Sequence, residues 1–229
     1  MRKFSMILII FCCFACQQSN NTADKAKAVS KEVIKEEKVA MEEDKSGKKK
    51  ILFFGDSLTA GFGLEEEESF PSLIQDRLDS MNLAYEVINA GLSGETSAGG
   101  KGRIEWVLNQ AMDIFVLELG ANDVLRGLDL KETDKNLRSI LDYVKKTYPD
   151  TKLMIAGMEA PPNMGAAYTK EFRIIFKRLA ADYGARIIPF LLEGVAGNPE
   201  LNLSDAKHPN AKGQHIVKEN VWAVLKTLL

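Results

Sequence analysis

A serine, a histidine and an aspartate in this sequence could together support nucleophilic attack on a carbonyl. Ser57 stands in the stretch ILFFGDSLTAGFG, residues 51–63, where an apolar run breaks off into a glycine-rich turn. A serine at a strand-to-helix turn projects its hydroxyl away from the core, but it is a poor nucleophile without an adjacent base. His208 could supply that base, and Asp205, three residues before it, could hold the imidazole in the required tautomer. The second histidine, His215, falls in the periodic part of the last helical segment, where a surface or groove position is expected.

Attack on a carbonyl also requires hydrogen-bond donors for the oxyanion that develops. The candidates are the backbone N–H groups of Ser57 and Gly94 and the side-chain amide of Asn122. Each residue also has a simpler structural interpretation, because serine often caps a helix, glycine serves tight turns and asparagine forms turns after strands. Asp205 could likewise cap the last helix. Catalysis is favoured by the occurrence of all these residues together in one order, not by any of them singly.

The elements that must position these residues alternate along the chain. Near-continuous apolar runs predict five strands, at residues 50–54, 85–88, 114–119, 153–157 and 186–188. Helical periodicity predicts helices at residues 70–81, 98–110, 131–148, 167–183 and 211–228. This alternation predicts an α/β fold in which a parallel sheet, buried on both faces, lies between two helical layers.

Polar and small residues follow each predicted strand. They are found at residues 55–57, 91–94, 120–123, 159–165 and, at some distance, 204–210. Open sheets of this kind bind ligands at the carboxyl ends of their strands. The sequence therefore predicts one site at one edge of the sheet.

Four blocks of the sequence resemble the GDSL (SGNH) hydrolase family. They are GDSLTAGFG, INAGLSGETSAGG, LGANDVLRG and DAKHPN, and in this order they cover essentially all of residues 51–229. The resemblance implies a flavodoxin-like three-layer α/β/α sandwich with a parallel five-stranded sheet. It also implies a catalytic triad of Ser57, Asp205 and His208 and an oxyanion hole formed by Ser57, Gly94 and Asn122. The serine lies in G-D-S-L and not in the GxSxG elbow of α/β-hydrolases.

Within the family the chain looks most like the esterase and lysophospholipase branch typified by bacterial thioesterase I. This implies a carboxylic ester hydrolase that cleaves small or lipid-like acyl esters through an acyl-enzyme, without a cofactor. The family's substrate-lining loop corresponds to a segment that contains Met158, Glu159, Pro161 and Met164, although its beginning departs from the usual basic-apolar pattern. Lys207, inside the last block, is expected to point to solvent.

Two other functions remain open on the sequence. A carbohydrate acetylesterase would use the same machinery with a more open, polar rim. A catalytically silent binding module is the alternative of a different class, and the intact set of site residues argues against it.

Composition disfavours a metal-dependent or nucleic-acid-binding function. Two histidines, and no cysteine after residue 16, leave few ligands for a metal. Residues 51–229 hold 25 acidic and 19 basic side chains, so nucleic acid is not the expected partner. No metal and no cofactor are expected, and the domain is expected to be a monomer that acts on a small-molecule or lipid ester.

Residues 1–16 have the order of a secretory signal peptide. Two basic residues precede an apolar run at 6–15 that is too short to span a bilayer, and small residues stand before Cys16. This ending resembles a bacterial lipoprotein cleavage site, at which the cysteine becomes the lipidated first residue, although Cys13 stands where leucine is usual. Plain cleavage, which would leave a free soluble protein, is the alternative.

Residues 17–49 contain no aromatic residue and are dense in lysine, glutamate and alanine. This composition is typical of a solvated, low-complexity tether. The hydrolase domain would then comprise residues 50–229. The expected location is the periplasm or cell envelope, with the protein held at a membrane by a lipid on Cys16.

Overall fold

Parallel strands form the sheet that positions every residue of the site. The computed structural model describes residues 47–229. In this part of the chain the strands are β1 (Lys49–Gly55), β2 (Tyr85–Gly91), β3 (Ile114–Glu118), β4 (Lys152–Ala156) and β5 (Arg186–Ile188). Their order in the sheet is β2-β1-β3-β4-β5, and every pairing is parallel. This is the doubly wound order of flavodoxin-like folds, which bind ligands where the strand order reverses, here between β1 and β3.

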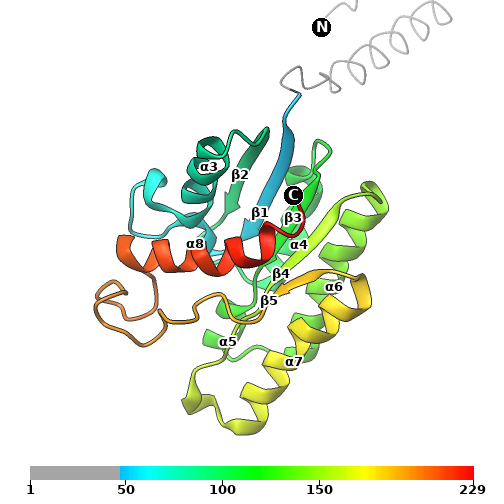
Figure 1. Ribbon diagram of the computed structural model, residues 1–229. Helices are drawn as coiled ribbons and strands as arrows, with labels where there is room; N and C mark the ends of the chain where they lie inside the picture. Colours follow the sequence, from blue (N-terminus) through cyan, green and yellow to red (C-terminus); the bar gives the residue numbers. More distant parts are fainter. Residues whose placement is uncertain (1–46) are drawn as a thin grey trace, which may run out of the picture. The chain divides into compact units, whose positions relative to one another are not determined.

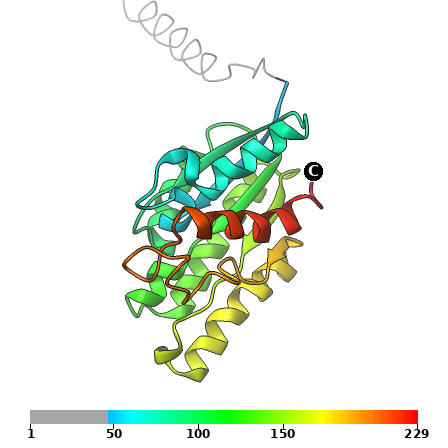
Figure 2. The same cartoon turned by 60° about the vertical axis from the view of Figure 1, so that its left-hand side comes forward.

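Helices cover both faces of this sheet (Figure 1). On one face, α3 (Phe70–Ser80) packs against α8 (Ala211–Leu225), and Figure 2 shows the two helices side by side from a second direction. The other face is covered by α4 (Ser97–Val107), α6 (Leu130–Thr147) and α7 (Ala166–Tyr183). The connections also contain the short helices α2 (Ser57–Ala60) and α5 (Ala121–Leu125) and the 3₁₀ turns η1 (Glu66–Glu68) and η2 (Pro162–Met164). The predicted three-layer α/β/α sandwich is thereby confirmed.

The predicted strands and helices agree with the structure to within about three residues at their ends. The largest differences are in β2, which continues to Gly91, and in α4 and α8, which end at Val107 and Leu225. The sequence did not predict α2 or α5, because four or five residues are too short to show helical periodicity. No helix in residues 47–229 is long and apolar enough to cross a membrane. The predicted signal peptide lies outside the described residues, as does most of the predicted tether, and β1 begins one residue before the predicted domain boundary.

The prediction that every strand is buried on both faces holds only in the middle of the sheet. All five residues of β3 are buried, as is the Ile51–Phe54 run of β1. In β2 and β5 most residues are partly exposed, because these strands form the two edges of the sheet. The core therefore lies around β1, β3 and β4, next to the point where the strand order reverses.

Close packing of α2 against the sheet depends on two glycines. Gly55, Gly91 and Glu118 are paired in register, so the carboxyl ends of β1, β2 and β3 are level. A Cβ atom on Gly91 would lie 2.3 Å from the backbone nitrogen of Ala60, and one on Gly55 would lie 2.1 Å from Oγ1 of Thr59. Only glycine leaves room for the helix at these positions. As a result α2 sits directly on the sheet edge.

Candidate active site

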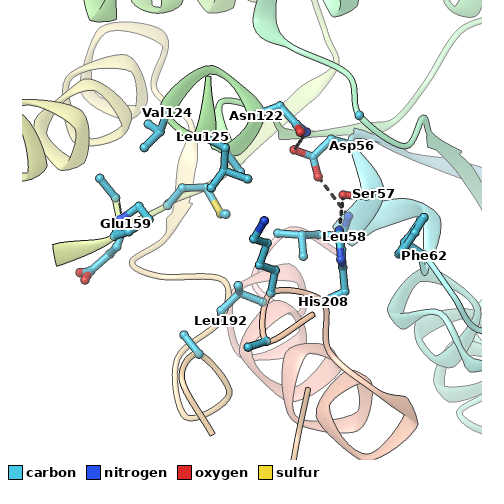
Figure 3. A pocket seen from close by; sticks show the side chains of 18 of the residues that line it. Asp56, Ser57, Leu58, Phe62, Asn122, Val124, Leu125, Glu159, Leu192 and His208 are labelled. Atoms are coloured by element: carbon cyan, nitrogen blue, oxygen red, sulfur yellow. Dashed lines mark hydrogen bonds between the residues drawn. The ribbon is translucent and has the colours of Figure 1, made fainter. Parts of the chain in front are cut away.

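Ser57 is the first residue of α2 and follows β1 after a single intervening residue. That residue, Asp56, caps the helix, because its Oδ1 accepts the backbone N–H of Leu58 at 3.0 Å. The capping role that Ser57 could have filled is thus taken by its neighbour. The serine is 8% exposed, and Figure 3 shows its hydroxyl close to the ring of His208. The hydroxyl of Ser57 is therefore available for chemistry at the sheet edge.

The loop before α8 carries Asp205 and His208 in a fixed arrangement. Oδ1 of Asp205 accepts the backbone N–H groups of Lys207 and His208 at 2.9 and 3.1 Å. Its other oxygen, Oδ2, lies 2.5 Å from Nδ1 of His208. The helix itself is capped by Asn210, so Asp205 does not have the alternative capping role. Both oxygens of this carboxylate instead hold the segment that contains the histidine.

His208 connects the aspartate to the serine. Its Nε2 lies 2.8 Å from Oγ of Ser57. A carboxylate can only accept a hydrogen bond, so the contact with Asp205 assigns the ring proton to Nδ1 and leaves Nε2 to accept the serine hydroxyl proton. The ring of Phe62 packs against the imidazole with a centroid distance of 4.5 Å. These contacts give the imidazole the orientation that a general base requires.

The charge of Asp205 is stabilised by the same contacts. Partial burial raises the pKa of this carboxyl, but hydrogen bonds from the His208 side chain and from the backbone N–H groups of His208 and Lys207 outweigh it and lower the pKa to about 2. Asp205 is therefore ionised throughout the range in which a histidine titrates. Its negative charge favours the imidazolium that forms when His208 takes a proton.

Three hydrogen-bond donors lie around the serine. Among the hydrogen bonds of residues 47–229, none uses the backbone N–H of Ser57 or of Gly94. Gly94 has a φ of +80°, a conformation that side chains disfavour. The side chain of Asn122 donates one hydrogen bond, from Nδ2 to Oδ2 of Asp56 at 3.0 Å, as Figure 3 shows. An amide nitrogen carries two hydrogens, so one remains for a ligand.

Two buried carboxyl groups lie beneath these donors. The backbone N–H of Asp56 and the hydroxyl of Thr59 both donate to Oε2 of Glu118, at 3.1 and 2.7 Å. Burial raises the pKa of Asp56 to about 6, and hydrogen bonds from Leu58 and Asn122 limit the rise. Burial, together with the charge of Asp56, raises the pKa of Glu118 well above its usual range. No motif in the sequence predicted Glu118 as a site residue; the register of β1 and β3 aligns it with Gly55.

Asp123 links three helices behind the site. It accepts hydrogen bonds from the backbone and the hydroxyl of Ser97, at the start of α4, and from the hydroxyl of Thr133 in α6. On the opposite side, Arg126 donates from Nη2 to the carbonyl oxygen of Gly94 at 2.7 Å. This second contact joins the α5 segment, which carries Asn122, to the loop that carries the glycine.

A cavity of about 800 Å³ opens beside Ser57 and His208. This volume falls in the range of small-molecule sites. Met158, Glu159 and Pro161 line it as the sequence predicted. Most of the other lining side chains are apolar. No sequence pattern predicted them, because they come from segments far apart in the chain: Leu58, Phe62, Val124, Leu125, Phe190, Leu192 and Ala196.

One prediction about this cavity was wrong. Met164, the last residue of the 3₁₀ turn η2, does not line it, because its side chain packs against the hydrophobic core. Lys207 is exposed, as predicted, but it also lines the cavity, so solvent is not its only environment. In residues 47–229 no group of three or more histidine, cysteine, aspartate or glutamate side chains could hold a metal ion.

Comparisons of the sequence and of the structure with known proteins all lead to hydrolases of one family. The profile of the GDSL-like lipase/acylhydrolase family matches residues 53–216. Esterase TesA of Pseudomonas aeruginosa is 37% identical over 180 residues, which cover 78% of this chain and 89% of that protein. The thioesterase 1/protease 1/lysophospholipase L1 of Escherichia coli K12 is 35% identical over 180 residues, with 78% of this chain and 84% of that protein covered. A crystal structure of TesA superposes with a TM-score of 0.75 at 36% identity and covers 79% of this chain and all of that one.

Proposed function

The chain belongs to the GDSL-like lipase/acylhydrolase family and is a serine ester hydrolase, and from this premise we propose that Ser57 is its nucleophile, with His208 as general base and Asp205 as the residue that orients the base. The observation that carries the assignment is the continuous chain of contacts from Asp205 through His208 to Oγ of Ser57, at 2.5 and 2.8 Å. Three side chains in this arrangement form a nucleophile activated by an adjacent base.

The reaction proceeds in two halves. Oγ of Ser57 attacks the ester carbonyl while Nε2 of His208 takes the hydroxyl proton, and the imidazolium then gives this proton to the departing alcohol. The N–H groups of Ser57 and Gly94 and the amide of Asn122 bind the oxyanion. A water molecule next gives a proton to His208 and attacks the acyl-enzyme; the bond between the acyl carbon and Oγ then breaks, Oγ takes the proton back from His208, and the carboxylic acid leaves.

The cavity supports an acyl ester with an apolar part as the substrate. Its walls are mainly aliphatic and aromatic, and apolar walls favour binding of an acyl chain over a sugar ring, whose hydroxyl groups would be left without partners. The relatives named esterase and lysophospholipase fit this class of substrate. A carbohydrate acetylesterase, which needs a polar rim, is less well supported.

A direct assay tests this function. The purified protein and its Ser57→Ala variant are compared on p-nitrophenyl esters of increasing acyl length, on a lysophospholipid and on acetylated xylan. Hydrolysis of the aryl and lipid esters that disappears in Ser57→Ala is the expected result. Turnover of acetylated xylan alone would contradict the proposed substrate class, and activity that survives in Ser57→Ala would contradict the proposed nucleophile.

We also propose that the protein is exported and anchored by a lipid on Cys16 in the cell envelope. The support is the sequence alone: a basic start, an apolar run at 6–15 and small residues before the cysteine. Two or three acyl chains on this residue would hold the protein stably at a membrane. The wild type is expected in the membrane fraction, and Cys16→Ser is expected as uncleaved precursor or soluble protein. Wild type that is wholly soluble, with an unmodified mature N-terminus, would contradict the anchor.

A further inference from the structure

Lys207 places a positive charge at a cavity whose walls are mainly apolar. It is exposed, lines the cavity beside Ala206 and His208, and makes no ion pair with any residue in 47–229. Lysine side chains commonly lay their methylene stem along apolar surface and keep the ammonium group in water. Lys207, which is exposed and also lines the apolar cavity, fits this arrangement of stem and ammonium group. The ammonium group is therefore available to a ligand.

The other charged groups at the cavity are already engaged. Glu159 pairs with Arg173 at 2.9 Å. Asp56 is buried and accepts hydrogen bonds from Leu58 and Asn122. Lys207 is thus the only lysine or arginine among the lining residues in 47–229, and it has no ion-pair partner in that part of the chain. Its ammonium group would attract an anionic group on a bound substrate.

The backbone holds Lys207 next to the proposed general base. Its N–H donates to Oδ1 of Asp205 at 2.9 Å, the same oxygen that holds the N–H of His208. Ala206, the residue before it, has a φ of +57°, which a loop maintains only when its surroundings enforce it. In the proposed reaction His208 must lie next to the departing oxygen, because it returns a proton to it. The side chain of the adjacent residue is then close to the alcohol portion of the ester.

We infer that Lys207 is a specificity-determining residue that favours esters whose alcohol portion carries an anionic group, such as a carboxylate or a phosphate. This inference rests on the proposed function. The interaction is expected to be modest and sensitive to salt, since an exposed ion pair is screened by solvent and by ions. It changes the relative rates of charged and neutral esters and leaves the chemical steps unaltered.

The test uses two substrates that share an acyl group and differ in charge: 4-carboxyphenyl octanoate, which is anionic, and 4-acetylphenyl octanoate, which is neutral. The ratio of kcat/KM for the anionic to the neutral ester is measured in wild type, Lys207→Met, Lys207→Glu and Lys212→Met. The comparison of this ratio between variants cancels the different intrinsic reactivity of the two esters. Lys212 is a matched control, because it is an exposed lysine of α8 that does not line the cavity.

The expected result is a ratio about two- to fivefold lower in Lys207→Met than in wild type, lower again in Lys207→Glu, and unchanged in Lys212→Met. The difference should largely disappear in about 0.5 M NaCl, where the Debye length is only about 4 Å. An unchanged ratio in Lys207→Met, or an equal fall in Lys212→Met, would overturn the inference. A wild type that hydrolyses neither ester faster than Ser57→Ala would instead overturn the proposed function.

The anionic group could belong to a lipid or to a soluble ester. The same variants, assayed on lysophosphatidylglycerol and on octanoyl-coenzyme A, distinguish a lipid head group from the phosphates of a soluble thioester. A fall in kcat/KM in Lys207→Met on one of the two identifies the source. Full activity of Lys207→Met on both would contradict the inference.

Discussion

Asn122 and Asp56 are joined by a hydrogen bond of 3.0 Å between Nδ2 and Oδ2. The proposed oxyanion donor is therefore held by the residue that immediately precedes the proposed nucleophile. Asp56 also caps α2 through Leu58. One buried carboxyl group thus orients both the helix that presents Ser57 and the amide that would stabilise the charge created by its attack.

The amide of Asn122 is expected to act on the transition state. Its free N–H would bond the oxyanion more strongly than the ground-state carbonyl, so Asn122→Ala should lower kcat about 10²–10³-fold with little change in KM. Steady-state kinetics on a p-nitrophenyl ester measure the effects on kcat and on KM separately. An effect confined to KM would make Asn122 a substrate-binding residue.

Asp56 is expected to make stability depend on pH. Its pKa is about 6 in the folded chain and 3.8 in the unfolded one, so the folded state binds the proton more tightly. The stability contributed by this proton is complete below about pH 4 and is lost as the pH rises through about 6. Urea unfolding measures this effect. Between pH 4 and pH 7 the free energy of unfolding of wild type should fall by about 1–3 kcal/mol relative to that of Asp56→Asn. A constant difference between the two proteins would rule out the shifted pKa.

Arg126 is expected to position Gly94. The hydrogen bond from Nη2 to the Gly94 carbonyl is lost in Arg126→Ala, and the loop that carries the glycine N–H would then be less well placed. We expect kcat to fall about tenfold with a small change in KM, less than for removal of a donor itself. Arg126→Lys, which can still donate to the carbonyl, should restore part of the loss. Equal kinetics in Arg126→Ala and wild type would exclude this role.

His208 must be neutral to accept the proton of Ser57. The value of kcat/KM should therefore fall at acid pH as the imidazole becomes protonated, while Asp205, with its pKa of about 2, remains ionised. His208→Ala should lose nearly all activity. His215→Ala is the matched control, since this histidine is exposed on α8 and should be dispensable. The reverse outcome would show that the general base had been assigned to the wrong histidine.

The sequence allowed prediction of the fold and of the polar part of the site because both depend on local patterns. The strands and long helices have clear periodicity, and Asp205 and His208 are near each other in the chain. The carboxyl ends of parallel strands bring Ser57, Gly94 and Asn122 to one edge whatever the details of packing. Spacing alone thus predicted the juxtaposition of these residues.

The rest of the site depends on three-dimensional packing that spacing does not report. Phe62 contacts His208 because α2 and the loop before α8 meet across the sheet edge. Glu118 contacts Asp56 and Thr59 only because of the register between β1 and β3. Met164 was misplaced because the 3₁₀ turn that directs it toward the core gives no periodic signal. Lys207 is exposed as expected, but its sequence neighbours do not reveal that it also lines the cavity.

The most direct test of Ser57 as the nucleophile is stoichiometric labelling by an organophosphonate ester, followed by peptide mass spectrometry. A nucleophilic serine displaces the leaving group and retains the phosphonyl group, which mimics the tetrahedral intermediate. We expect one phosphonyl group per chain, on Ser57, with activity lost in proportion, and no label in Ser57→Ala that circular dichroism shows to be folded. Proportional inactivation with the label on another residue, or undiminished labelling of Ser57→Ala, would contradict this assignment.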